Sequence, residues 1–117
     1  PDRRVINFQA DGSAAYTLQS LWTQARENLN ITTLLCANRR YRILEREVAR
    51  AGNASPGEHT RALMDLSRPA IDWAALGRSM GVPAIRVQTA EDLAKGLSAA
   101  LGEQGPFLIE LNLAGAS

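Results

Sequence analysis

The 117-residue chain has one cysteine, one histidine and no excess of charge of either sign. A single cysteine, Cys36, excludes an intramolecular disulfide framework and favours a reducing compartment, which we take to be the cytoplasm. Thirteen basic and twelve acidic residues give a net charge of +1, which offers no support for binding to nucleic acid or to a membrane surface. No signal peptide or membrane span is visible. What remains is the size of one small domain, with 45% hydrophobic residues to build a core.

The sequence also lacks the Gly-x-Gly-x-x-Gly fingerprint and the lysine-bearing phosphate loop, which disfavours a plain nucleotide-binding module. It shows no internal repeat. The chain opens with Pro-Asp-Arg-Arg directly before a strand pattern, without an initiator methionine. We therefore expect it to be a fragment of a longer polypeptide.

Apolar runs alternate along the chain with amphipathic segments, which predicts an α/β fold: a parallel sheet with helices on its faces. The first run is mostly apolar, so we expect that strand to be covered on both faces. Strands are predicted at residues 5–9, 31–36, 84–87 and 107–113. Helices are predicted at 17–28, 41–51, 71–80 and from 89 to 101, with a short helix at 60–66 inside a mobile surface excursion from 52 to 69.

Three side chains that could carry chemistry have simpler explanations. Trp22 falls on the apolar stripe of its predicted helix, so we expect it in the core rather than in a binding site. Cys36 ends an apolar run and is expected to be an inert buried thiol. His59 could act as a general base, but an exposed loop histidine is the default expectation.

Two polar turns follow the first two predicted strands: Asp11-Gly12-Ser13 after the first and Ala37-Asn38 after the second. In a right-handed crossover these strands are parallel, so both turns should emerge at one edge of the sheet, where open α/β sheets bind ligands. Asp11 and Asn38 would offer one charged and one neutral oxygen to Mg²⁺. The backbone amides of Gly12 and Ser13 would suit a diphosphate. On spacing alone, helix capping by Asp11 and Asn38 explains the pattern equally well.

An asparagine 27 positions after the aspartate of Asp-Gly-Ser resembles the thiamine-diphosphate signature of acetolactate synthase, benzoylformate decarboxylase, pyruvate decarboxylase and their relatives. The resemblance covers almost the whole chain. It implies the diphosphate-binding domain of the thiamine-diphosphate-binding fold, with the remaining domains of the enzyme absent from this chain. Further positions that resemble the family are Ala14, Tyr16, 21–23, Ala25, 41–44, 72–73, Leu76, 81–82 and 105–110.

The resemblance implies a role for each matching position. Asp11 and Asn38 would ligate Mg²⁺ through their side chains, and Arg40 would ligate it through its main-chain carbonyl. Gly12 and Ser13 would hold the diphosphate. Tyr41 would make a further phosphate contact, while Ile43 and Leu44 match positions that often face the substrate and the thiazolium ring.

Three positions depart from the family pattern. Ala10 replaces the usual leading glycine, which is tolerable if the backbone at residue 10 is not at positive φ. Ala37 replaces the first asparagine, a residue that supports the turn but is not the expected ligand. Arg39 replaces a common glycine. These departures put full activity in question rather than the fold.

Enzymes of the family use thiamine diphosphate and Mg²⁺ to decarboxylate 2-oxo acids. The enamine that remains is protonated to an aldehyde or attacks a second carbonyl compound. The glutamate that activates the cofactor lies on another domain, usually of a partner subunit. The resemblance therefore assigns no catalytic residue to this chain and implies a homodimer or homotetramer. Residues 40–44 and 66–76 favour the acetolactate-synthase-like group, which we prefer, whereas 21–23 favour benzoylformate-type decarboxylases. A degenerate domain kept for assembly is the remaining alternative.

Overall fold

The computed structural model describes residues 3–10, 14–15, 18–37, 50–52, 57–65 and 69–112. Within these ranges the chain forms a four-stranded, entirely parallel sheet with the strand order β1-β2-β4-β3. The predicted α/β fold is therefore confirmed, and each predicted strand is present with bounds that differ by one residue at most. The strands are β1 (Val5–Ala10), β2 (Ile31–Ala37), β3 (Ala84–Val87) and β4 (Phe107–Asn112).

The helices described are α2 (Ser20–Arg26), α4 (Glu58–Met64), α5 (Trp73–Ser79) and α6 (Ala90–Leu101). α2 and α5 are shorter than predicted, and Asn28, at φ +48°, lies beyond the end of α2 in a left-handed conformation that helices do not continue. Most of the predicted helix at 41–51 lies outside the described residues. No helix in the described ranges is long and apolar enough to cross a membrane.

Local sequence explains where α6 begins. Thr89 precedes it, and its side-chain oxygen accepts a hydrogen bond of 3.0 Å from the backbone N–H of Asp92. Glu91 and Asp92 stand in the first turn, where the helix dipole favours negative charge. Thr89 is thus the N-cap of α6.

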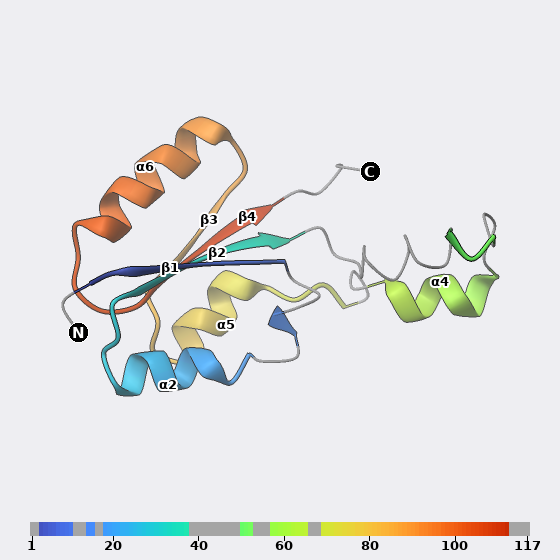
Figure 1. Ribbon diagram of the computed structural model, residues 1–117, viewed down its shortest axis with the longest axis horizontal. Helices are drawn as coiled ribbons and strands as arrows, with labels where there is room; N and C mark the ends of the chain where they lie inside the picture. The colour runs from blue at the N-terminus through green and yellow to red at the C-terminus, as the bar shows by residue number, and fades with distance from the viewer. Residues whose placement is uncertain are drawn as a thin grey trace.

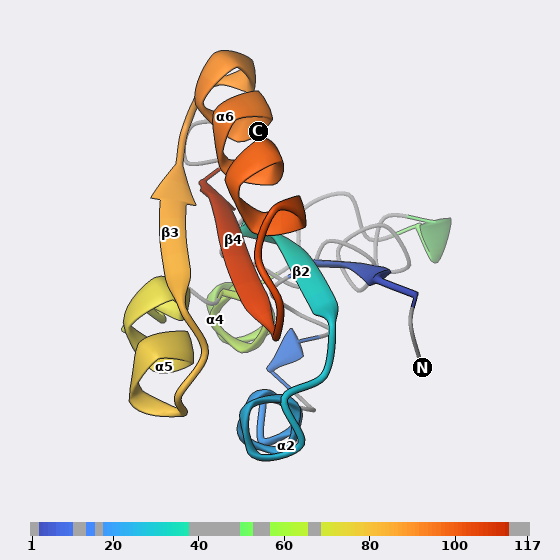
Figure 2. The ribbon, with the colours of Figure 1, turned by 90° about the vertical axis from the view of Figure 1, so that its left-hand side faces the viewer.

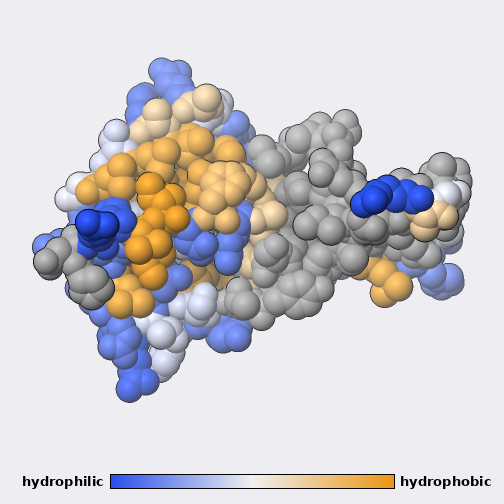
Figure 3. All heavy atoms as spheres, viewed as in Figure 1, coloured by the Kyte–Doolittle hydropathy of each residue, from blue (hydrophilic) through white to orange (hydrophobic). Residues whose placement is uncertain are grey.

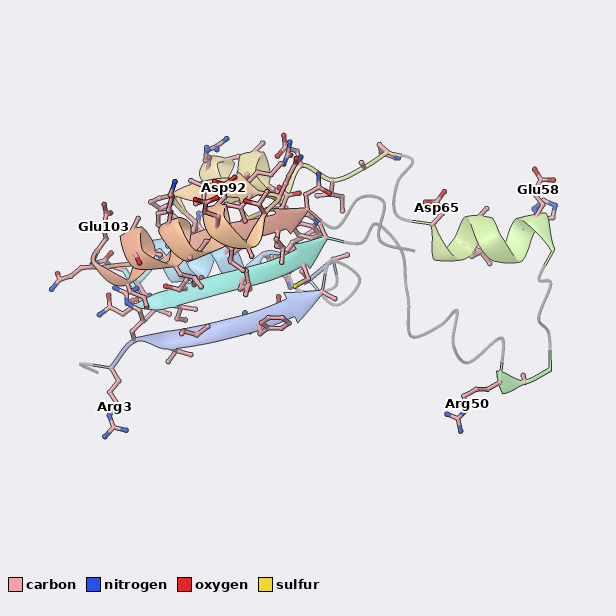
Figure 4. All side chains as sticks on the ribbon, turned by 90° about the horizontal axis from the view of Figure 1, so that it is seen from above. Arg3, Arg50, Glu58, Asp65, Asp92 and Glu103 are labelled. Carbon is pink, nitrogen blue, oxygen red and sulfur yellow. The ribbon has the colours of Figure 1, made fainter. Side chains whose placement is uncertain are left out.

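The helices form a layer on each face of the sheet (Figures 1 and 2): α6 on one face, and α2 and α5 on the other. Leu34, Val87 and Ile109 pack beneath α6. On the opposite face, Leu35 and Leu108 pack against residues of α2 and α5. We call these two faces the α6 face and the α2/α5 face. α4 lies apart from the sheet and carries Glu58, with Asp65 directly after its last residue (Figure 4).

The expectation that the first strand is covered on both faces is wrong. Among the described strands, β1 stands at the edge of the sheet with β2 as its single neighbour. Its apolar side chains remain exposed: Phe8 is 68% accessible, and Val5 and Ile6 are more than half exposed. α6 packs on β3 and β4, so it does not reach the other end of the sheet (Figure 2). Figure 3 shows apolar side chains gathered on the side of the molecule that carries β1.

The prediction that Trp22 lies in the core is also wrong. Its side chain is 52% exposed, and the guanidinium of Arg26, one turn later, lies 5.3 Å from the ring centroid, within the range of a cation–π contact. Leu21 takes the core position instead. Cys36 is half-buried rather than buried. His59 is exposed as expected, although it lies on α4 and not in a loop.

Candidate functional site

The carboxyl ends of all four strands lie at one edge of the sheet, because the strands are parallel and in register there. Ala10 at the end of β1 pairs with Cys36, and Ala37 at the end of β2 pairs with Asn112 of β4. Asp11 and Asn38 are the next residues in the sequence after Ala10 and Ala37. The prediction that the two strands before the polar turns are parallel and end at one edge of the sheet is confirmed, and the structure shows in addition that they are adjacent.

The residues predicted to bind metal and cofactor lie outside the described ranges, so their assignments stay predictions. This applies to the whole predicted set: Asp11, Gly12, Ser13, Asn38, Arg40, Tyr41, Ile43 and Leu44. The departure at Arg39 lies outside as well.

The other two departures from the family pattern can be placed. Ala10 is part of β1, and it does not belong to the described residues with positive φ, so its methyl group causes no backbone strain. Ala37 is buried and belongs to the core under the α2/α5 face. Its side chain therefore packs in the core, rather than supporting the turn as a polar residue would.

A buried carboxylate near this edge was assigned no role in the sequence analysis. Glu110 of β4 has a side chain that is 3% exposed. Its Oε1 accepts hydrogen bonds from the backbone N–H of Ala74, at 3.0 Å, and from Nε of Arg86, at 3.3 Å. Glu110 of β4 and Arg86 of β3 are register partners. Glu110 lies two positions before Asn112, the last residue of β4. The signal was present in the sequence as a charged residue inside each of two apolar strands.

Arg86 extends the network to Asp72, which precedes α5. The Nη2 atom of Arg86 lies 2.7 Å from Oδ1 of Asp72, and the same oxygen accepts a 3.0 Å hydrogen bond from the backbone N–H of Ala75. Asp72 and Glu110 thus satisfy two of the N–H groups that the first turn of α5 leaves without intrahelical partners. The network joins β3, β4 and the N-terminus of α5 beside the carboxyl edge.

The same contacts shift two pKa values. The hydrogen bond from Ala75 and the positive charge of Arg86 lower the pKa of Asp72 below its ordinary value of 3.8. The charge of Glu110 and its hydrogen bond, with a smaller contribution from Asp72, raise the pKa of Arg86. Both groups are therefore held in their charged forms.

The profile of the thiamine pyrophosphate enzymes, for their C-terminal TPP-binding domain, matches residues 1–111. The chain belongs to this family. The resemblance found in the sequence is therefore confirmed at the level of the family and of the fold.

Named relatives fall into two groups. The chain is 48% identical over 112 residues to IlvX of Mycobacterium tuberculosis, named as a candidate acetolactate synthase large subunit, and 33% identical over 113 residues to the benzoylformate decarboxylase of Pseudomonas aeruginosa. Each match covers 95% of this chain. Among solved structures, the thiamine diphosphate-dependent 4-hydroxybenzoylformate decarboxylase of Rhodococcus jostii superposes with a TM-score of 0.84 at 30% identity, over 96% of this chain and 20% of that one. The chain spans about a fifth of the curated relatives, 22% and 20% of their lengths.

Proposed function

We propose that this chain is the diphosphate- and magnesium-binding part of an acetolactate-synthase-like enzyme that acts on 2-oxo acids. The observation that carries the proposal is the pairing of β1 with β2, whose adjacent carboxyl ends directly precede Asp11 and Asn38. Membership of the family gives these two residues their proposed roles. The 48% identity to the mycobacterial relative favours the synthase-like group.

In this proposal the metal ligands are all oxygen atoms. Asp11 supplies a carboxylate, Asn38 a side-chain amide oxygen and Arg40 a main-chain carbonyl, a donor set that suits Mg²⁺, which commonly completes its shell with phosphate oxygens and water. Gly12 and Ser13 hold the diphosphate through backbone amides. The remaining positions, proposed to contact phosphate, substrate or thiazolium ring, are Tyr41, Ile43 and Leu44.

In this proposal the chain binds and orients the cofactor and the metal. When bound, thiamine diphosphate supplies the electron sink that decarboxylation of a 2-oxo acid requires. The chain's own residues would fix the metal and the diphosphate, so that the reactive end of the cofactor is presented to residues of other domains. No residue of this chain is proposed to transfer a proton, and the activating glutamate is proposed to lie on another domain.

The uncovered face of β1 supports the proposal that other parts of the enzyme complete the domain. Ile6 and Phe8 are exposed on the face of β1 opposite to Asn7 and Gln9, and the edge strand also offers unpaired backbone groups. The chain accounts for about a fifth of the length of its relatives, and we propose that a further segment of the same enzyme chain covers this face. A cytoplasmic homodimer or homotetramer is proposed for the whole enzyme.

A benzoylformate-type decarboxylase is the second candidate, favoured by the name of the Pseudomonas relative and by the superposition on the Rhodococcus enzyme. The two candidates differ in the acceptor: a decarboxylase releases an aldehyde, whereas a synthase forms a carbon–carbon bond. Analysis of the products formed from aromatic and aliphatic 2-oxo acids separates them. A non-catalytic domain, which the buried Ala37 favours, would give neither product.

The first prediction tests the cofactor role by calorimetric titration of thiamine diphosphate into the full-length enzyme, with and without Mg²⁺. We expect binding to require the metal. Asp11→Ala removes a charged ligand, so affinity should fall by at least the roughly 10–100-fold typical for loss of a residue that only supports a metal ligand.

The matched control is Asp92→Ala, which removes an exposed carboxylate from the first turn of α6 and should leave cofactor affinity unchanged. Binding that is independent of Mg²⁺, or equal in Asp11→Ala and the wild-type enzyme, would contradict the proposed metal site. A complete lack of binding would favour the non-catalytic alternative.

A further inference from the structure

A small cavity lies between α2 and the part of the sheet formed by β1 and β2, on the α2/α5 face. Its polar lining comes from both sides of this gap. Asn7 and Gln9 of β1 and Thr33 of β2 line it from the sheet, and Ser20 and Gln24 line it from α2. The rest of its described lining is apolar and belongs largely to the core under this face.

Two of these side chains carry buried oxygen atoms without a partner. Gln24 is 7% exposed and Thr33 is 2% exposed. Neither Oε1 of Gln24 nor Oγ1 of Thr33 has a hydrogen-bond partner within the part of the chain that the structure describes. Buried polar atoms are satisfied in the great majority of folded proteins, so two such atoms beside one cavity require an explanation.

The size and chemistry of the cavity restrict what could satisfy them. The centre of a water-sized sphere can reach about 10 Å³ within it, which is near the lower limit of about 10–15 Å³ needed for one water. None of the described residues that line it is charged. A neutral lining of this kind does not balance the charge of an ion in a buried position.

We propose that this cavity holds one ordered water that bridges Gln24 and Thr33. The amide oxygen of Gln24 is an acceptor, so the water donates one hydrogen to it. The hydroxyl of Thr33 can accept the second hydrogen or donate its own to the water. Asn7, the register partner of Thr33 on β1, lines the same cavity and offers a third partner, as buried waters typically have.

The water would link α2 to both β1 and β2. Gln9 and Ala14, which also line the cavity, are the described lining residues on either side of the Asp11 turn in the sequence. The bridge therefore connects the helix to the sheet at the level of Asn7 and Thr33, in the middle of β1 and β2. This inference does not depend on the proposed function, because it concerns hydration of the core.

The direct test is a high-resolution crystal structure of the full-length enzyme. We expect a water peak within hydrogen-bond distance, about 2.7–3.2 Å, of both Oγ1 of Thr33 and Oε1 of Gln24. An empty cavity, or a direct hydrogen bond between the two side chains, overturns the proposal. This test needs no variant, so it stands even if a substitution prevents folding.

The sign of a stability change gives a second test. Thr33→Val replaces the hydroxyl by a methyl of similar size. If the water is bound, the variant deprives it of a partner and the midpoint of denaturation falls; if the oxygen is unsatisfied and dry, removing it leaves the midpoint unchanged or raises it. Thr23→Val, on the exposed side of α2, is the matched control and should have little effect.

A double-mutant cycle with Gln24→Leu completes the design. Because both side chains would bind the same water, the two substitutions together should shift the midpoint by less than the sum of the single shifts. Strictly additive shifts, or a midpoint that rises in Thr33→Val, overturn the shared water.

Discussion

Asp72 and Glu110 both accept hydrogen bonds from the first turn of α5, yet their surroundings differ. Glu110 is enclosed between the sheet and the helix, whereas the side chain of Asp72 is more than half exposed. Removing one partner of a buried ion pair is costly because the other charge remains without compensation, but exposed pairs contribute little. Glu110 should therefore contribute more to stability than Asp72, whereas Asp72 is accessible to protons from the solvent.

The residue-scale prediction concerns Asp72→Asn. Asparagine is also a good N-cap, so the substitution isolates the charge. The pKa of Asp72 is lowered in the folded protein; its stabilising effect is thus fully present above the ordinary value of 3.8 and is lost as the pH falls through the folded value. Denaturation midpoints of the full-length enzyme should be lower for the variant at pH 7, and the gap should close below about pH 3.8.

Glu103→Gln is the control, since it removes an exposed carboxylate that follows α6. A gap between wild type and Asp72→Asn that stays constant down to pH 3 would show that the charge of Asp72 does not stabilise the fold.

At the scale of elements, glycines allow two helices to approach the sheet closely. A Cβ added at Gly77 of α5 would lie 2.9 Å from Cδ2 of Leu108 and 3.3 Å from Cβ of Ala84. One added at Gly96 of α6 would lie 2.7 Å from Cδ1 of Ile85. The neighbours differ: Leu108 is fully buried and Cβ of Ala84 moves only with the backbone, whereas Ile85 is half-buried and can rotate.

We therefore predict that the same substitution has different effects on stability at the two positions. Alanine gains up to about 1 kcal/mol of helix propensity over glycine at either site. In Gly96→Ala this gain offsets the free-energy cost of moving the side chain of Ile85, so the free energy of unfolding should stay within about 1 kcal/mol of wild type. In Gly77→Ala overpacking dominates and should cost about 1–3 kcal/mol. Equal denaturation midpoints for the two variants of the full-length enzyme would contradict this account.

The elements themselves could largely be predicted from the sequence, and their pairing could not. The bounds of β3 and the cap at Thr89 follow from local patterns, since alternation and capping depend on neighbouring residues. The insertion of β4 between β2 and β3 depends on contacts between residues far apart in the sequence. Trp22 was misplaced because an apolar stripe indicates which face can be buried, not whether another element covers it.

For the candidate site, the sequence predicted that the strands preceding Asp11 and Asn38 are parallel and end at one edge of the sheet, and the parallel pairing of β1 with β2 confirms this. It did not predict the contacts of Glu110, because two charged residues on strands of unknown order cannot be matched before the order is known. The ligand set itself stays a prediction.

At the scale of the whole molecule, the open face of β1 should be the most sensitive to the rest of the enzyme. If another segment covers Phe8, Phe8→Ala in the full-length enzyme should destabilise it by about 3–5 kcal/mol, as expected for a core phenylalanine. If Phe8 stays as exposed as it is in this chain, the cost should be within about 0.5 kcal/mol, as for other surface positions. Chemical denaturation distinguishes the two values.

Leu101→Ala is the comparison, because Leu101 is also an exposed apolar residue, 49% accessible, but ends α6 rather than lying on β1. A loss of stability in Phe8→Ala no greater than that in Leu101→Ala would contradict coverage of β1.

The contact between Arg86 and Glu110 also has an evolutionary consequence. Loss of the arginine alone would leave the buried carboxylate of Glu110 without its charged partner, and loss of the glutamate alone would leave the N–H of Ala74 without its acceptor, while Arg86 would keep its contact with Asp72. Either single change passes through a destabilised intermediate, although its cost should stay below the about 3–5 kcal/mol of a fully buried pair, because the side chain of Arg86 is 41% exposed. Replacing both residues with apolar ones of similar volume can be close to neutral. Positions 86 and 110 should therefore diverge together among descendants of this sequence, as a pair of charges or as a pair of apolar residues.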